Sequence, residues 1–206
     1  MENLASSAWR VFRLWVRLSS RHNTITILTS DSCGNGLLAH ILIAEGYEGH
    51  GIDLRSRLSW SHYPSTTQAH LHVYTFNPLL ITTTTDDPYF KPGVFVIGNH
   101  ADELTPWVPV VSAIFSAAGY LSIPCCPWSF DVKYDRSTAP TYGIPNDDFI
   151  DNLNLGGSGT NDSSYSKYRI WLSSLSLHCG WEVECETLRI PSTRGWSIIG
   201  ACCPER

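Results

Sequence analysis

Four polar residues that can do acid–base or hydrogen-bonding chemistry stand within five consecutive positions of the sequence. They are Asn99, His100, Asp102 and Glu103, and they follow the apolar run GVFVIG at residues 93–98. A positioned carboxylate or imidazole can take a proton from a weak nucleophile such as a hydroxyl group, so the segment predicts a site. The two acidic residues could instead stabilise the N-terminus of a following helix. Both roles stay open on the sequence alone.

A glycine-rich turn and a nearby aspartate form the second group of residues that could bind a ligand. The β-branched run at 24–29 predicts a buried strand, and the segment 37–46 predicts a helix. Between them, Gly34 and Gly36 allow the backbone to approach a ligand closely. Asp53 ends the next predicted strand, 17 residues after Gly36, where a carboxylate can accept hydrogen bonds from both hydroxyls of a ribose. This arrangement is typical of a nucleotide-cofactor site.

Two classes of cofactor fit that arrangement. With Ala39, the two glycines satisfy the loose dinucleotide pattern G-x-G-x-x-A. A short-chain dehydrogenase would also need a tyrosine with a lysine four residues later, and no tyrosine of this chain has one. We therefore favour S-adenosylmethionine and keep a nicotinamide-dependent oxidoreductase as the alternative.

The elements that must position these residues alternate along the chain. Strands are expected at 24–29, 49–53, 70–76, 93–98 and 119–124, and helices at 37–46, 105–118 and 165–179. We expect the helix at 105–118 to begin with Thr105 as N-cap and Pro106 at the first helical position. Segments 181–190 and 196–202 predict a hairpin around PSTRG, and 77–92 and 127–164 predict long loops.

This order predicts one α/β domain over residues 24–206, preceded by an amphipathic segment at 1–23. The expected fold is Rossmann-like and doubly wound, with a mostly parallel sheet and an antiparallel C-terminal hairpin. The leading segment carries three arginines among apolar residues. It is expected to cap the domain, with a mitochondrial transit peptide as the minor alternative to a cytoplasmic protein.

Composition narrows the possible partners. The chain has 206 residues and a formal net charge of −5, which counts against unaided nucleic-acid binding and favours a local basic patch or a helper subunit. Its seven cysteines contain no C-x-x-C pair, so we expect thiols in a reducing compartment and no metal. No apolar run has the length of a membrane span, so no membrane contact is expected.

Four blocks of sequence give the chain a specific resemblance. They are CGNGLLAHILIAEGYEGHGIDLR (33–55), IGNHADELTPWVPV (97–110), IPCCPWSFDVKY (123–134) and LRIPSTRGWSIIG (188–200). In this order they resemble the tRNA (uracil-2′-O-)-methyltransferases, which modify a uridine of serine tRNAs. The resemblance implies a class I methyltransferase fold, S-adenosylmethionine as cofactor, and transfer of a methyl group to a ribose 2′-hydroxyl.

The resemblance also assigns roles to particular residues. Those expected to hold the cofactor are Gly34, Asn35, Gly36, Asp53 and Asn99. Those expected at the methyl-transfer step are His100, Asp102 and Glu103, and those expected to face the RNA are Lys133, Tyr134 and Arg194. The wider basic patch would comprise Lys133, Arg136, Lys167, Arg169, Arg189 and Arg194.

The chain departs from the family pattern in one place. The family has an acidic residue and a glycine in the run before C-G-N-G, and this chain has Thr29-Ser30-Asp31-Ser32 there. A fold-retaining, catalytically weak RNA-binding protein is therefore a further alternative.

Overall fold

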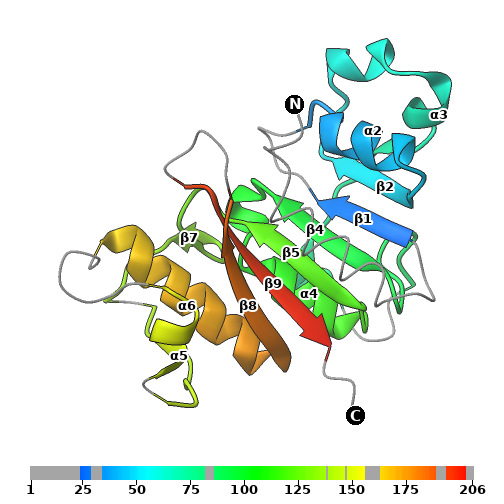
Figure 1. The fold of residues 1–206 in the computed structure, drawn as a ribbon. Helices are drawn as coiled ribbons and strands as arrows, with labels where there is room; N and C mark the ends of the chain where they lie inside the picture. The colour runs from blue at the N-terminus through cyan, green and yellow to red at the C-terminus, as the bar shows by residue number, and fades with distance from the viewer. Residues whose placement is uncertain are drawn as a thin grey trace.

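A seven-stranded, mostly parallel sheet organises the chain (Figure 1). The computed structural model describes residues 24–28, 34–81, 86–137, 139–146, 148–155, 163–188 and 194–202. The strands of the sheet are β1 (Thr24–Leu28), β2 (Glu48–Asp53), β3 (Leu71–Val73), β4 (Phe95–Asn99), β5 (Gly119–Ile123), β8 (Trp181–Thr187) and β9 (Trp196–Cys202). Their spatial order is β3-β2-β1-β4-β5-β9-β8.

Strand direction confirms the predicted fold class. The first five strands pair in parallel, and β9 lies antiparallel between β5 and β8. The C-terminal hairpin predicted from the sequence is therefore present, and its second strand is the one that joins the parallel part of the sheet. The predicted segment 189–193 of the connection lies outside the described residues.

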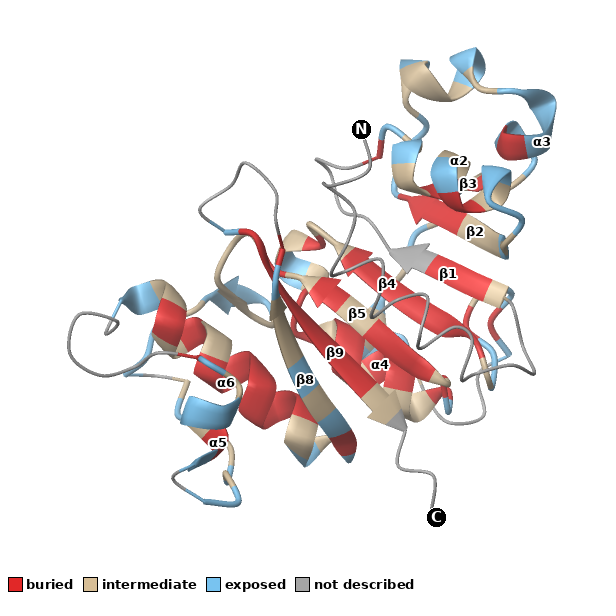
Figure 2. Ribbon diagram, viewed as in Figure 1, coloured by how far each residue is buried: buried red, intermediate tan, exposed pale blue. Residues whose placement is uncertain are grey.

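Helices cover the sheet and create two apolar cores. On one face, α4 (Trp107–Ile114) and α6 (Ser164–His178) pack over the larger core, whose buried members include Val96, Tyr120 and Trp171. On the other face, α2 (Leu37–Ala44) packs over Ile25, Phe95 and Ile97. Phe95, Val96 and Ile97 alternate between the faces because successive side chains of a strand point in opposite directions. The central strands are consequently buried on both faces (Figure 2).

The ends of two helices have the same hydrogen-bond pattern. After α2, Gly46 has φ 89°, as expected for the glycine predicted to terminate this helix. After α4, Ser116 takes that position with φ 52°, and Ala117 N–H donates to the Ser112 carbonyl at 2.8 Å. Helix α4 therefore ends at Ile114, four residues before the predicted end at Ala118, because the left-handed serine stops it.

The predicted start of α4 is also corrected. Its N-cap is Pro106, which makes no side-chain capping hydrogen bond, and the first helical residue is Trp107. Thr105 closes the short 3₁₀ turn η3 (Asp102–Leu104) that precedes the helix. The two acidic residues therefore lie in the first turn of η3, and the chain enters α4 through it.

The remaining elements are short. They are η1 (Leu58–His62), α3 (Ser65–Gln68), η2 (Pro78–Leu80), β6 (Trp128–Ser129), β7 (Val132–Lys133) and α5 (Asp148–Asn152). The last three interrupt the segment 127–164 that was predicted to be a loop, with β6 and β7 forming a small antiparallel hairpin. In the part of the chain that the structure describes, no helix is long and apolar enough to span a membrane.

Candidate functional site

The residues predicted for cofactor binding and methyl transfer lie near the carboxyl ends of neighbouring strands. Strand β1 lies between β2 and β4, and Leu28 pairs with both Ile52 and Gly98. Asp53 therefore ends the strand on one side of β1, and Asn99 ends the strand on its other side. In open α/β sheets, ligands bind beyond this edge of the sheet.

Gly34 and Asp53 fit against each other closely. The Asp53 side chain is buried, with the residue 2% exposed, and a Cβ added at Gly34 would stand 1.9 Å from its Oδ2. Gly34 does not have a left-handed backbone. This position requires glycine because a side chain would overlap the Asp53 carboxylate. Asp53 Oδ1 accepts a hydrogen bond from the Arg55 N–H at 3.1 Å, and Arg57 Nη2 lies 3.9 Å from Oδ2.

The turn before α2 is held from two sides. Gly36 has φ 79°, which glycine adopts without steric cost, and the Asn35 side chain accepts from the Leu37 N–H at 3.0 Å. From η1, the Trp60 indole N–H donates to the Gly34 carbonyl, and the Ser59 hydroxyl donates to the Asn35 carbonyl at 3.0 Å. Neither Ser59 nor Trp60 is predicted from the sequence, because η1 matches no motif.

The end of β4 is strained where the polar residues stand. His100 has φ 53° and Asp102 has φ 41°, a backbone region that non-glycine residues rarely occupy. The His100 N–H donates to the Ile123 carbonyl at 3.3 Å, which continues the β4–β5 ladder by one residue. Asn99, His100 and Asp102 are half-buried, whereas Glu103 is exposed. Of the two acids, Asp102 is the one that faces a partner element.

That partner is the segment following β5. The Cys125 thiol lies 3.3 Å from Asp102 Oδ1 and donates to it. Burial, followed by hydrogen bonding to Asp102 and Cys126, raises the pKa of the Cys125 thiol to about 12. Cys125 is therefore a neutral thiol whose proton is directed at the carboxylate. The sequence predicts no role for this cysteine, because its spacing matches no cysteine motif.

Arg194 reaches the same segment from the hairpin. Its guanidinium donates to the Cys125 carbonyl and stands 5.7 Å from the centre of the Tyr165 ring. The Tyr165 hydroxyl in turn donates to the Pro124 carbonyl at 2.8 Å. Arg194, predicted to contact RNA, is thus brought to the segment that carries the thiol facing Asp102.

The other residues predicted to face RNA lie on and near the β6–β7 hairpin. Lys133 is exposed, and its Nζ stands 4.0 Å from the centre of the Trp128 ring. Tyr134 is half-buried and packs against Tyr168 and Trp171 of the larger core. Core packing explains the position of the Tyr134 ring. The exposed Lys133 ammonium group can instead contact an anionic partner such as a phosphate.

The wider basic patch is only partly described. Arg136 is exposed, and Arg169 stands 4.3 Å from the centre of the Trp196 ring. Arg189 lies outside the described residues, as do the run at 29–32 that departs from the family pattern and the segment 1–23. That these six basic residues gather on one surface stays a prediction.

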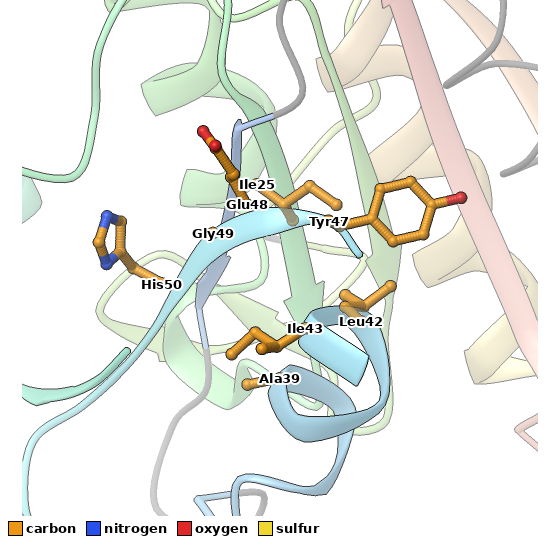
Figure 3. A pocket seen from close by; sticks show the side chains of 8 residues that line it. All are labelled: Ile25, Ala39, Leu42, Ile43, Tyr47, Glu48, Gly49 and His50. Carbon is orange, nitrogen blue, oxygen red and sulfur yellow. The ribbon is translucent and has the colours of Figure 1, made fainter. Parts of the chain in front are cut away.

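A separate apolar pocket lies between α2 and the beginnings of β1 and β2 (Figure 3). Its lining residues are Ile25, Ala39, Leu42, Ile43, Tyr47, Glu48, Gly49 and His50. Three of them belong to α2, and the others stand at the amino ends of β1 and β2, so the pocket is at the opposite edge of the sheet from Asp53 and Asp102.

Comparison with known proteins agrees with this geometry. Residues 1–78 match the family described as "Predicted AdoMet-dependent methyltransferase". Proteins named tRNA (uracil-O(2)-)-methyltransferase are 33% identical in Schizosaccharomyces pombe and 36% in Neurospora crassa, each match covering 97% of this chain and 40% of the relative. The relative in Candida glabrata is 31% identical over 97% of this chain and 43% of its own length.

The chain therefore spans about two fifths of the length of these relatives. Within that span the likeness runs through the whole described fold, from the glycine turn to the C-terminal hairpin. Over 97% of its length the chain is similar to the tRNA (uracil-O(2)-)-methyltransferases, and its first 78 residues match the family of S-adenosylmethionine-dependent methyltransferases.

Proposed function

We propose that this chain carries the S-adenosylmethionine-dependent site of a methyltransferase that modifies the ribose 2′-hydroxyl of a uridine in tRNA. The observation that carries the proposal is the placement of Asp53 at the end of β2 and of Asp102 just after β4, the two strands on either side of β1. Asp53 would bind the cofactor ribose, and Asp102, which follows the strand two places away in the sheet, would face the acceptor.

The residues beside Asp53 fit the cofactor. Because Gly34 has no side chain, the Asp53 carboxylate can lie directly against the backbone of the glycine turn, where an added Cβ would stand 1.9 Å from Oδ2. The Asp53 side chain is held by the Arg55 N–H, and a carboxylate fixed at the end of β2 is suited to bind both hydroxyls of a ribose. When bound, the cofactor supplies a methyl group already activated on a sulfonium. Gly34, Asn35 and Gly36 would lie under its methionine part, and Asn99 would contact it from β4.

On the acceptor side, the chain must orient a weak nucleophile and receive its proton. Asp102 can accept the hydroxyl hydrogen bond, and the Cys125 thiol holds the carboxylate in place by donating to Oδ1. His100 stands next to it on the same strained turn and is the second candidate for the proton. Glu103, which is exposed, is left with a supporting electrostatic role.

tRNA is the proposed substrate, and a serine tRNA is the finer proposal that the family resemblance supports. Lys133 and Arg194 would contact phosphates, since each presents a cation near the site or on the adjoining hairpin. The net charge of −5 makes the overall electrostatic attraction to RNA weak, so a helper subunit would strengthen tRNA binding.

The alternative of a nicotinamide-dependent oxidoreductase is not favoured by the sheet. The doubly wound dinucleotide fold continues after its fifth strand with a sixth parallel strand. Here the strand beside β5 is β9, which is antiparallel, and β8 follows it at the edge.

The test compares two conservative variants in single-turnover methylation of tRNA. Asp102→Asn should lower the rate by about 10²–10⁴-fold, the usual worth of a positioned general base. Glu103→Gln should stay within a few-fold of the wild type because its side chain is exposed. Melting temperatures and calorimetric titration with S-adenosylmethionine serve as controls for folding and cofactor binding. Equal rates in the wild type and Asp102→Asn would remove Asp102 from the chemistry.

A further inference from the structure

Three potential metal ligands converge at the carboxyl ends of β4 and β5. The Asp102 carboxylate and the thiols of Cys125 and Cys126 have donor atoms that all lie within 4.8 Å of one another, and all three residues are half-buried. Two of these donors come from adjacent positions in the chain and the third from another strand end. The fold, and not local sequence, brings them together.

The separation of the Cys125 and Asp102 donor atoms suits a tetrahedral ion. A zinc ion takes thiolate sulfur at about 2.3 Å and carboxylate oxygen at about 2.0–2.2 Å, which places two such ligands about 3.5 Å apart. The Cys125 Sγ and Asp102 Oδ1 atoms are 3.3 Å apart. A thiol proton currently occupies the space between them, and metal binding would displace it.

The backbone around these donors is already fixed. The Cys125 carbonyl accepts from Arg194, and the Pro124 carbonyl accepts from Tyr165 at 2.8 Å. On the other side, the ladder from β5 continues to His100, and Asp102 is held at φ 41°. Hydrogen bonds that orient the residues carrying metal ligands are a usual part of a metal site. Strained residues of this kind also cluster at functional sites.

We propose that Asp102, Cys125 and Cys126 form a zinc site with three protein ligands and a fourth position for an oxygen ligand. Two thiolates with one carboxylate favour zinc over magnesium or calcium, which prefer oxygen alone. Three protein ligands with an open position are the pattern of a catalytic zinc site, whereas structural sites use four. The cysteine spacing by itself predicts no metal, because adjacent cysteines match no C-x-x-C pattern.

The fourth ligand would be a water or a hydroxyl oxygen. If the proposed function holds, that hydroxyl would be the ribose 2′-hydroxyl of the RNA, whose pKa a bound zinc ion would lower. Asp102 bound through one carboxylate oxygen would still present a second oxygen atom to the acceptor. The metal site itself does not depend on this step.

The test measures metal binding directly on the whole chain. Protein prepared with zinc and passed through a desalting column should retain about one zinc per chain by mass spectrometry. Cobalt(II) titration should give thiolate-to-metal charge-transfer bands and the visible spectrum of a tetrahedral ion. Cys125→Ser, Cys126→Ser and Asp102→Asn should each weaken cobalt binding by at least about 10–100-fold, the range known even for residues that only support ligands.

The controls separate this site from the other thiols. Cys179→Ser removes a cysteine outside the cluster, and the double variant Cys202→Ser/Cys203→Ser removes the C-terminal pair; both should bind cobalt like the wild type. Loss of binding in either control but not in Cys125→Ser would overturn the proposal, as would a wild-type chain that binds no cobalt. S-adenosylmethionine binding to the wild-type chain is titrated in a separate experiment. A wild-type chain that binds S-adenosylmethionine but no cobalt would reject the zinc site and leave the proposed function standing.

Discussion

Replacing Gly34 by alanine tests the contact on which the cofactor site depends. The new Cβ would stand 1.9 Å from Asp53 Oδ2, 2.8 Å from its Cγ and 2.9 Å from Arg57 Nε. Comfortable contact needs about 3.5 Å, so the carboxylate must withdraw by about 1.6 Å. Because Asp53 is buried at the end of β2, it cannot do so without leaving the position proposed for the cofactor ribose.

The expected loss is the worth of charge-assisted hydrogen bonds, about 1.5–3 kcal/mol. This corresponds to S-adenosylmethionine affinity lowered about 10–150-fold, measured by calorimetric titration. Asp53→Asn should produce a loss of the same order. In the double variant the two losses should not add, because both act through the same carboxylate.

The matched control is Gly143→Ala, since a Cβ at Gly143 meets nothing within 4 Å. It should leave both affinity and melting temperature unchanged. Wild-type affinity in Gly34→Ala would refute the close-contact argument, and fully additive losses in the double variant would show that Gly34 acts without Asp53.

Three further predictions concern stability and RNA binding. Gly200→Ala places a Cβ 2.0 Å from Cε1 of the fully buried Tyr120 and should lower the free energy of unfolding by about 1–3 kcal/mol; an unchanged denaturant midpoint would contradict this. Burial and histidine–histidine repulsion lower the pKa values of His50 and His72 below the ordinary 6.5, so stability present above pH 6.5 should be lost as the pH falls. His50→Gln/His72→Gln should flatten that decline in melting temperature, and an unaltered pH profile would exclude the pair. Arg194→Ala should weaken tRNA binding and reduce the salt slope by about one, as expected for one phosphate contact; a slope equal to the wild type would remove it from the interface.

The sequence alone determined the fold class and most of its elements. Short apolar runs, separated by helical and turn segments, predicted the five parallel strands and the hairpin. A strand buried on both faces needs a continuous apolar run, and a hairpin needs a turn between two strands. Gly46 was identifiable as the end of α2, since few other residues adopt φ 89° without cost. Asp53 and the turn at Gly34 were identifiable because their spacing reflects the length of one βαβ unit.

Local sequence was less informative where tertiary contacts override propensity. Thr105-Pro106 has the composition of a helix start, yet the strained turn at Asp102 places η3 before the helix and moves the N-cap to Pro106. Ser116 gives no glycine signal, yet it ends α4 in the left-handed region. The conformation at such positions depends on the packing of the surrounding chain, and the local sequence does not reveal that packing.

Only the tertiary structure decided which side chains face one another. The two acids at 102 and 103 are equivalent in sequence, but the parallel pairing of β4 with β5 directs Asp102 toward Cys125 and leaves Glu103 exposed. Trp60 likewise reaches Gly34 across 26 residues. Contacts between distant segments arise from strand order and register, and a single sequence encodes those only through the packing of the whole domain.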